Sequence, residues 1–220
     1  TMGGLWVDYE LQTSIKGLFA LGECNFSDHG ANRLGASALM QGLSDGYFVI
    51  PYTMQNYLSD QIQVPHIDTN APEFEEAEKG VQAEIDRIYN IKGDESVDHI
   101  HKKLYHIMWD YVGMARNEKG LKKALAMLKD IRKEFNEHVR IPGDKEGLNT
   151  ELDKAIHLRD FITMGELIAY DALERNESCG GHFREESQTE EGEAKRNDEE
   201  FMYVACWEYQ KDDDTAPVLH

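Results

Sequence analysis

Apolar residues recur at helical spacing through the middle of the chain. One pattern opens near Pro72, a residue favoured at the start of a helix, and a second covers about 96–114. The third is the clearest, because its apolar positions from Leu121 to Val139 lie three or four residues apart with charged residues between them. A fourth runs from about 150 to 175. Long amphipathic helices with short connections predict an antiparallel bundle.

The two ends of the chain have other patterns. Leu18-Phe-Ala-Leu21 is a short apolar run that ends at Gly22, which predicts a buried strand. A helix is expected over about 36–58, and Pro51 inside it predicts a kink or two helices. Residues 201–209 alternate in character and predict a strand, whose partner we expect beyond the C-terminus of this chain. With the bundle, these elements predict an α+β fold.

Four segments follow from these patterns. We expect residues 1–60 to be the closing part of an α/β domain and residues 61–73, which contain two prolines, to be a linker. The helical bundle is expected over 74–178. Residues 179–220 then form an irregular acidic region that contains the strand near 201–209.

The charge balance is strongly acidic. Lysine and arginine total 23 against 42 acidic residues, a formal charge of −19, so binding to nucleic acid is not expected. No stretch approaches the roughly 20 apolar residues that span a bilayer, so no direct membrane insertion is expected. Cys24, Cys179 and Cys206 are widely spaced and form no CxxC pair, which indicates a reducing compartment and no metal site.

The segment His29–Leu39 places one arginine among small residues. The Arg33 guanidinium is always charged and offers a planar fork of donors that matches a carboxylate. Small side chains around it let backbone N–H groups approach a flat ligand, and the start of the following helix favours anions. This combination predicts a small-molecule site that binds a carboxylate.

His29-Gly-Ala-Asn-Arg-Leu-Gly35 resembles the signature of the flavoprotein subunit of succinate dehydrogenase and fumarate reductase. Other segments resemble that family in the same order, so the similarity covers nearly the whole chain. They are Thr1–Gly4, Gly17–Glu23, Met108–Asn117 and Arg175–Arg184.

The resemblance implies a FAD enzyme that interconverts succinate and fumarate by hydride transfer to or from the flavin. Arg33 matches the family's substrate-binding arginine, which makes it the expected catalytic residue. Glu23 matches the acid that accepts hydrogen bonds from the ribityl chain. Ala38 and Leu39 match two positions whose backbone N–H groups approach the flavin pyrimidine edge, although this chain has Ser37-Ala-Leu39 where the family commonly has Asn-Ser-Leu.

The resemblance also implies partners: an iron–sulfur subunit and a membrane-anchor cytochrome b subunit. Through them the complete subunit is expected on the inner, cytoplasmic face of the plasma membrane. The family's first flavin-binding half, substrate histidine and capping domain have no counterpart in these 220 residues. We therefore expect a C-terminal fragment that is inactive alone and does not retain FAD.

Two other interpretations remain open. L-aspartate oxidase shares the fold and a similar arginine loop, so the substrate of the complete protein could differ. In the second interpretation the bundle at 74–178 is a non-catalytic interaction scaffold. Tight flavin binding by this chain would count against the scaffold.

Overall fold

The computed structural model describes residues 3–26, 29–145, 147–210 and 215–220. Thr1 and Met2, half of the Thr1–Gly4 segment, lie outside the described residues. The chain divides into two compact units. The first comprises residues 1–67, 179–182 and 202–206, and the second comprises residues 68–178, 183–201 and 207–220.

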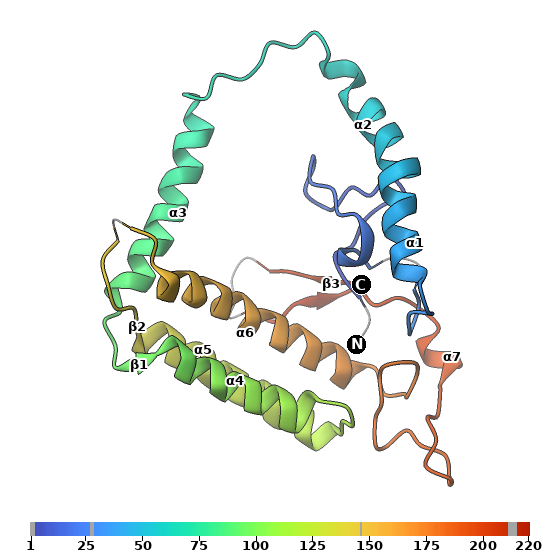
Figure 1. Cartoon of the computed structure of the whole chain (residues 1–220). Helices are drawn as coiled ribbons and strands as arrows, with labels where there is room; N and C mark the ends of the chain where they lie inside the picture. Colours follow the sequence, from blue (N-terminus) through green and yellow to red (C-terminus); the bar gives the residue numbers. More distant parts are fainter. Residues whose placement is uncertain (1–2, 27–28, 146, 211–214) are drawn as a thin grey trace. The chain divides into compact units, whose positions relative to one another are not determined.

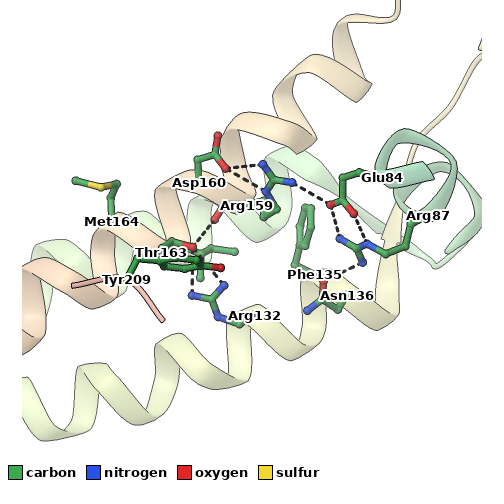
Figure 2. Close-up of a pocket in the computed structure, with 11 residues that line it drawn as sticks. Glu84, Arg87, Arg132, Phe135, Asn136, Arg159, Asp160, Thr163, Met164 and Tyr209 are labelled. Atoms are coloured by element: carbon green, nitrogen blue, oxygen red, sulfur yellow. Dashed lines mark hydrogen bonds and ion pairs between the residues drawn. The ribbon is translucent and has the colours of Figure 1, made fainter. Parts of the chain in front are cut away.

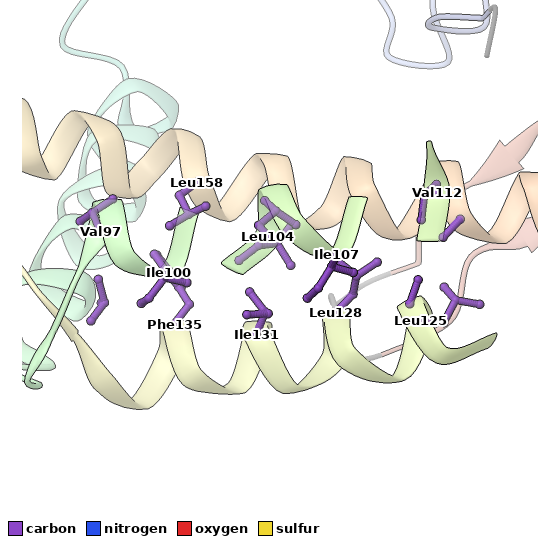
Figure 3. Close-up of a cluster of buried hydrophobic side chains, with 14 of the residues drawn as sticks. Val97, Ile100, Leu104, Ile107, Val112, Leu125, Leu128, Ile131, Phe135 and Leu158 are labelled. Atoms are coloured by element: carbon purple, nitrogen blue, oxygen red, sulfur yellow. The ribbon is translucent and has the colours of Figure 1, made fainter. Parts of the chain in front are cut away.

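The second unit is built around three long helices, α4 (Val97–Val112), α5 (Glu118–His138) and α6 (Thr150–Glu174) (Figure 1). Their apolar faces meet in one core (Figure 3), so the helical patterns predicted for these segments are confirmed. Fully or nearly fully buried members include Ile100, Leu104 and Ile107 of α4, Leu121, Leu128 and Phe135 of α5, and Leu158 and Ile162 of α6.

Each helix of the bundle begins at a polar cap. The side chain of Ser96 accepts from the His99 N–H ahead of α4, and that of Asn117 accepts from the Gly120 N–H ahead of α5. The Asn149 side chain accepts from the N–H groups of Glu151 and Leu152 at the start of α6. These caps satisfy backbone donors that have no partner inside the helix.

Two buried arginines cap the C-terminal ends of α4 and α6. The Arg116 Nε donates to the Val112 carbonyl at 3.1 Å, and the Arg184 Nη1 donates to the Ala172 carbonyl at 2.8 Å. Burial is the main cause that lowers the pKa of Arg116. A cation at a helix C-terminus donates hydrogen bonds to free carbonyls and interacts favourably with the negative end of the helix dipole. Both arginines therefore stabilise the bundle.

A further helix, α3 (Pro72–Asn90), leads into the bundle. The short strand β1 (Glu95–Ser96) follows it and pairs in parallel with β2 (Val139–Arg140), which comes after α5. Gly93 passes so close to the backbone at the end of α5 that a Cβ there would lie 1.9 Å from the His138 carbonyl oxygen. Only glycine allows this approach.

The C-terminal region contains helix α7 (Asp198–Phe201) and strands β3 (Trp207–Glu208) and β4 (Val218–Leu219), which pair antiparallel. Of the segment 201–209, only its last part is therefore a strand, and its partner lies inside this chain. The Trp207 indole N–H donates to Asp171 at 2.9 Å. The helix at Asp198–Phe201 forms because three acids in its first turn favour a helix N-terminus.

The first unit holds two helices, α1 (Ser37–Ser44) and α2 (Ile50–Leu58), joined by the π-helical turn η2 (Asp45–Val49). The two short 3₁₀ turns of this unit are η1 (Gly22–Cys24) and η3 (Ser59–Gln61). The predicted interruption at Pro51 is confirmed. Because proline lacks an N–H group, it stands in the first turn of α2, where that donor is not needed.

Leu18–Leu21 does not form the predicted buried strand. Within the described residues, Phe19 makes one isolated bridge to Gln12, and Leu18 is 47% exposed. The backbone turns at Leu11 and at Gly17, both with positive φ, so the pairing of the two segments ends after the single Gln12–Phe19 bridge. Among the described residues, no helix of either unit is long and apolar enough to cross a bilayer. Mainly helical, with short strands, the chain has the predicted α+β fold.

Candidate active site

Glu23 and Arg33, assigned separately from the sequence, form an ion pair in the first unit. The Arg33 Nη1 lies 3.3 Å from the Glu23 Oε1, and the two side chains are 45% and 53% exposed. An ion pair this exposed contributes little stability, about 0–1 kcal/mol. The Arg33 guanidinium can therefore exchange Glu23 for the carboxylate of a ligand at small cost.

The turn that carries Glu23 is fixed by two polar side chains of the neighbouring helical segment. Buried Asp45 accepts from the Gly22 N–H at 2.7 Å. Gln41, also buried, donates to the Gly22 carbonyl at 2.9 Å. Both backbone groups of Gly22 are hydrogen-bonded, so the backbone that leads into Glu23 is fixed. Gly22 has a φ of +68°, a left-handed conformation that favours glycine.

Gln41 also connects this turn to the arginine loop. Its amide nitrogen donates to the Asn25 side-chain oxygen at 2.9 Å, and its oxygen lies 2.7 Å from the His29 Nε2. Asn25 is buried and donates in turn to the Ala20 carbonyl at 3.0 Å. His29 thus supports the loop from its base, and α1 organises both segments that carry the ion pair.

The start of α1 presents backbone donors beside this pair. Ala36 precedes the helix with φ +62°, a left-handed conformation that turns the chain into α1. Ala38 is buried in the first turn, and Leu39 is 75% exposed. Their N–H groups belong to the first turn of a helix, where the helix itself supplies no acceptor. Small residues and an exposed apolar side chain leave this edge open to a flat ligand.

Sequence reasoning did not identify Gln41 and Asp45. Both stand in a run otherwise rich in apolar residues, four positions apart and so on one helix face. That pair of polar residues was the available signal. Their partner, Gly22, lies 23 residues before Asp45, and no local pattern shows that contact.

A groove lies elsewhere, in the second unit, between α3, α5 and α6 (Figure 2). Its volume is about 690 Å³, and three arginines line it. Each is engaged by a carboxylate: Glu84 pairs with both Arg87 and Arg159, and Arg132 pairs with Glu166. We interpret the groove as a structural ion network. Among the described residues, no group of three or more histidine, cysteine or acidic side chains gathers as a metal site.

Comparison with known families agrees with this geometry. Residues 1–39 match a FAD binding domain, and residues 101–219 match the C-terminal domain of the fumarate reductase flavoprotein. A flavin-binding segment followed by a helical domain defines the class as flavin-dependent oxidoreductases, with FAD as the cofactor of the complete subunit. Within that class, the chain belongs to the succinate dehydrogenase and fumarate reductase flavoprotein family.

The similarity holds along most of the chain. It is 31% identical over 186 residues to the fumarate reductase flavoprotein subunit of Haemophilus influenzae, covering 84% of this chain and 30% of that protein. It is 29% identical over 204 residues to the succinate dehydrogenase flavoprotein subunit of Bacillus subtilis, covering 92% of this chain and 33% of that protein. The chain thus spans about a third of the length of these relatives.

A solved structure shows the same arrangement of elements. The FrdA chain of Escherichia coli quinol fumarate reductase is 28% identical and superposes with a TM-score of 0.81, covering 99% of this chain and 35% of that one. The family resemblance derived from the motifs is therefore confirmed.

Proposed function

We propose that the complete subunit to which this chain belongs interconverts succinate and fumarate, with Arg33 as a clamp for one substrate carboxylate. The observation that carries this proposal is the exposed Arg33–Glu23 pair at the start of α1. A four-carbon dicarboxylate carries two negative charges, so its site needs cations at fixed positions. Arg33 supplies one of them in a loop rich in glycine and alanine.

The residues around this pair fit a bound flavin. Glu23 is an exposed carboxylate, suited to accept hydrogen bonds from the ribityl hydroxyls. A Cβ at Gly30 or Gly35 would meet no atom within 4 Å, so the loop edge is open. The backbone N–H groups of Ala38 and Leu39 are proposed to face the flavin pyrimidine edge. When bound, FAD supplies the hydride chemistry of the reaction.

The role of Arg33 is to bind and orient. A bidentate guanidinium–carboxylate contact fixes both the position and the rotation of the substrate carboxylate. Orientation of reacting groups is worth several kcal/mol of barrier in favourable cases, about 7–11 at most. Lysine keeps the charge but offers no planar fork.

The test is the flavin absorbance of the full-length gene product before and after addition of succinate. We expect succinate to bleach the flavin band in the native protein. Arg33→Lys should retain FAD and lose most of the turnover, about 10²-fold or more, because misplacement of about 1 Å can cost that much. Glu23→Gln should instead lower FAD retention.

Each outcome separates one part of the proposal. Normal turnover in Arg33→Lys contradicts the clamp. A flavin that binds but does not respond to succinate rejects this substrate, and L-aspartate in the same assay then tests the aspartate oxidase alternative. Absence of flavin from the full-length product contradicts the flavin site, and the non-catalytic helical scaffold is then the remaining interpretation.

We further propose the domain and partner arrangement expected from the sequence. Residues 1–60 complete a flavin-binding domain, 74–178 form the helical domain, and this chain alone is inactive. The complete subunit is proposed to bind an iron–sulfur subunit and to reach the cytoplasmic face of the membrane through an anchor subunit. The similarity to a chain of quinol fumarate reductase supports this proposal.

A further inference from the structure

A tight turn at residues 179–182 belongs to the same compact unit as the loop at 29–35, which carries Arg33. Cys179 and His182 close the turn, because the N–H group of each donates to the carbonyl of the other, at 2.9 and 3.1 Å. Reciprocal bonds across two residues are those of a short hairpin and leave the backbone little freedom. The turn therefore has a defined shape of its own.

The tip of this turn contacts the loop at Ala31. The Gly181 N–H donates to the Ala31 carbonyl at 3.2 Å. Beside it, a Cβ at Gly180 would lie 2.2 Å from the Ala31 carbonyl oxygen and 2.6 Å from the carbonyl carbon. Gly180 also has a φ of +58°, which residues with a side chain adopt only with strain. Two independent features therefore require glycine at position 180.

Ala31 lies where a contact from outside the loop matters most for Arg33. His29 holds the base of the loop through Gln41, whereas Ala31 stands only two residues before the guanidinium. A Cβ at Gly30 would meet no atom within 4 Å, so open space borders the loop beside Ala31. Because glycine leaves the backbone many conformations, such a loop needs a further contact to hold Arg33 in one direction.

We propose that the turn at 179–182 is a positioning element for Arg33. By its close approach to Ala31 it sets the place where the guanidinium meets the carboxylate of the substrate. Gly180 is the residue on which this depends, because a side chain there would displace the loop. This inference rests on the proposed function, in which Arg33 is the carboxylate clamp, and adds a second segment that orients the clamp.

Gly180→Ala in the full-length protein tests the proposal. The closed turn resists movement, so the added methyl shifts the loop by about 1 Å, and a misplacement of that size can cost about 10²-fold in rate. We expect kcat/KM for succinate to fall about tenfold or more. FAD content and reduction of the flavin by dithionite, which does not use the clamp, should stay native.

Two further variants separate the contact from backbone strain. Gly192→Ala is the matched control, because Gly192 is also exposed and has a φ of +83°, but a Cβ there comes no closer than 3.7 Å to the Gln188 side chain. It should keep native kinetics. Gly180→Asn adds the same Cβ, although asparagine tolerates a positive φ, so it should lose as much activity as Gly180→Ala. Recovery in Gly180→Asn would assign the effect to strain and overturn the proposal.

Amide hydrogen exchange of residues 29–36 reports how firmly the loop is held without using the substrate. We expect faster exchange there in Gly180→Ala than in the native protein and in Gly192→Ala. If the native enzyme does not respond to succinate, the proposed function fails, and this exchange alone decides whether the turn holds the loop. Unchanged exchange, unchanged succinate kinetics in an active enzyme, or loss of FAD in Gly180→Ala overturns the proposal.

Discussion

At the scale of single residues, the hydrogen bond that Asp45 accepts from Gly22 holds the turn that carries Glu23. The buried Asp45 carboxylate receives the Gly22 N–H at 2.7 Å, next to the residue proposed to bind the ribityl chain. A hydrogen bond to a charged group contributes about 1.5–3 kcal/mol, and its loss leaves the buried Asp45 carboxylate and the partly buried Gly22 N–H without this bond. We therefore expect Asp45 to act as a positioning residue for Glu23, through the backbone of Gly22.

We expect Asp45→Ala in the full-length protein to lose FAD more readily and to unfold about 2 kcal/mol more easily. Flavin content after gel filtration and urea unfolding measure the two effects. Asp45→Asn, which keeps an acceptor oxygen, should recover most of both. Asp60→Ala, at an exposed acid in η3, is the control. Unchanged flavin content in Asp45→Ala would show that Glu23 is positioned by other contacts.

Residue-level inference from the sequence named two members of the candidate site, Glu23 and Arg33, from the motifs that contain them. The structure shows that their side chains form an ion pair, and their roles stay predictions. Gln41 and Asp45 were missed, because they act through backbone groups distant in the sequence. A motif identifies the residues that resemble a ligand site, whereas the supporting hydrogen bonds depend on how the chain folds back.

At the scale of elements, helices were predicted better than strands. The apolar positions of α5 are three to four residues apart, and such a helix closes its own hydrogen bonds, so the local pattern suffices. A strand needs a partner, and Leu18–Leu21 has one rung because turns end its pairing. Phe201 alternates with its neighbours but ends helix α7, because the acids before it favour a helix N-terminus.

We expect the attachment of α3 to the bundle to weaken in acid, because Glu84 of α3 pairs with Arg159 of α6 as well as with Arg87 of its own helix. Hydrogen bonding to Arg87 is the main cause that lowers the pKa of Glu84 from its ordinary value of 4.5, and Arg159 adds to it. Since the pKa is lower in the folded state, Glu84 stabilises that state at pH values above 4.5. The contribution is lost as the pH falls from about 5 through the folded-state pKa.

Amide hydrogen exchange in the last turns of α3, compared at pH 6 and at about pH 3.5, measures this loss after correction for intrinsic rates. The native chain should lose more protection on acidification than Glu84→Gln, in which the charge is absent at both pH values. Glu76→Gln, in the exposed part of α3, should behave like the native chain. Equal losses in the native chain and Glu84→Gln would show that the ion pairs do not hold α3.

At the scale of the whole molecule, repulsion between acidic residues opposes folding. The net charge is −19, and many of the cations already form exposed pairs with acids, such as Lys79 with Glu75 and Lys122 with Glu118. Exposed pairs contribute about 0–1 kcal/mol each, so screening them costs little. Screening the unpaired excess of carboxylates relieves self-repulsion throughout the chain.

We therefore expect the thermal midpoint to rise by several degrees between about 10 and 150 mM NaCl, where the Debye length shortens from about 30 to 8 Å. Most of the rise should come within that interval, because screening saturates while other salt effects grow steadily. A variant that replaces Glu190 and Glu191 with lysine, in the acidic stretch near the C-terminus, should show a smaller rise. A midpoint that falls with salt would mean that the ion pairs, including those of Arg132 and Glu84, outweigh the repulsion.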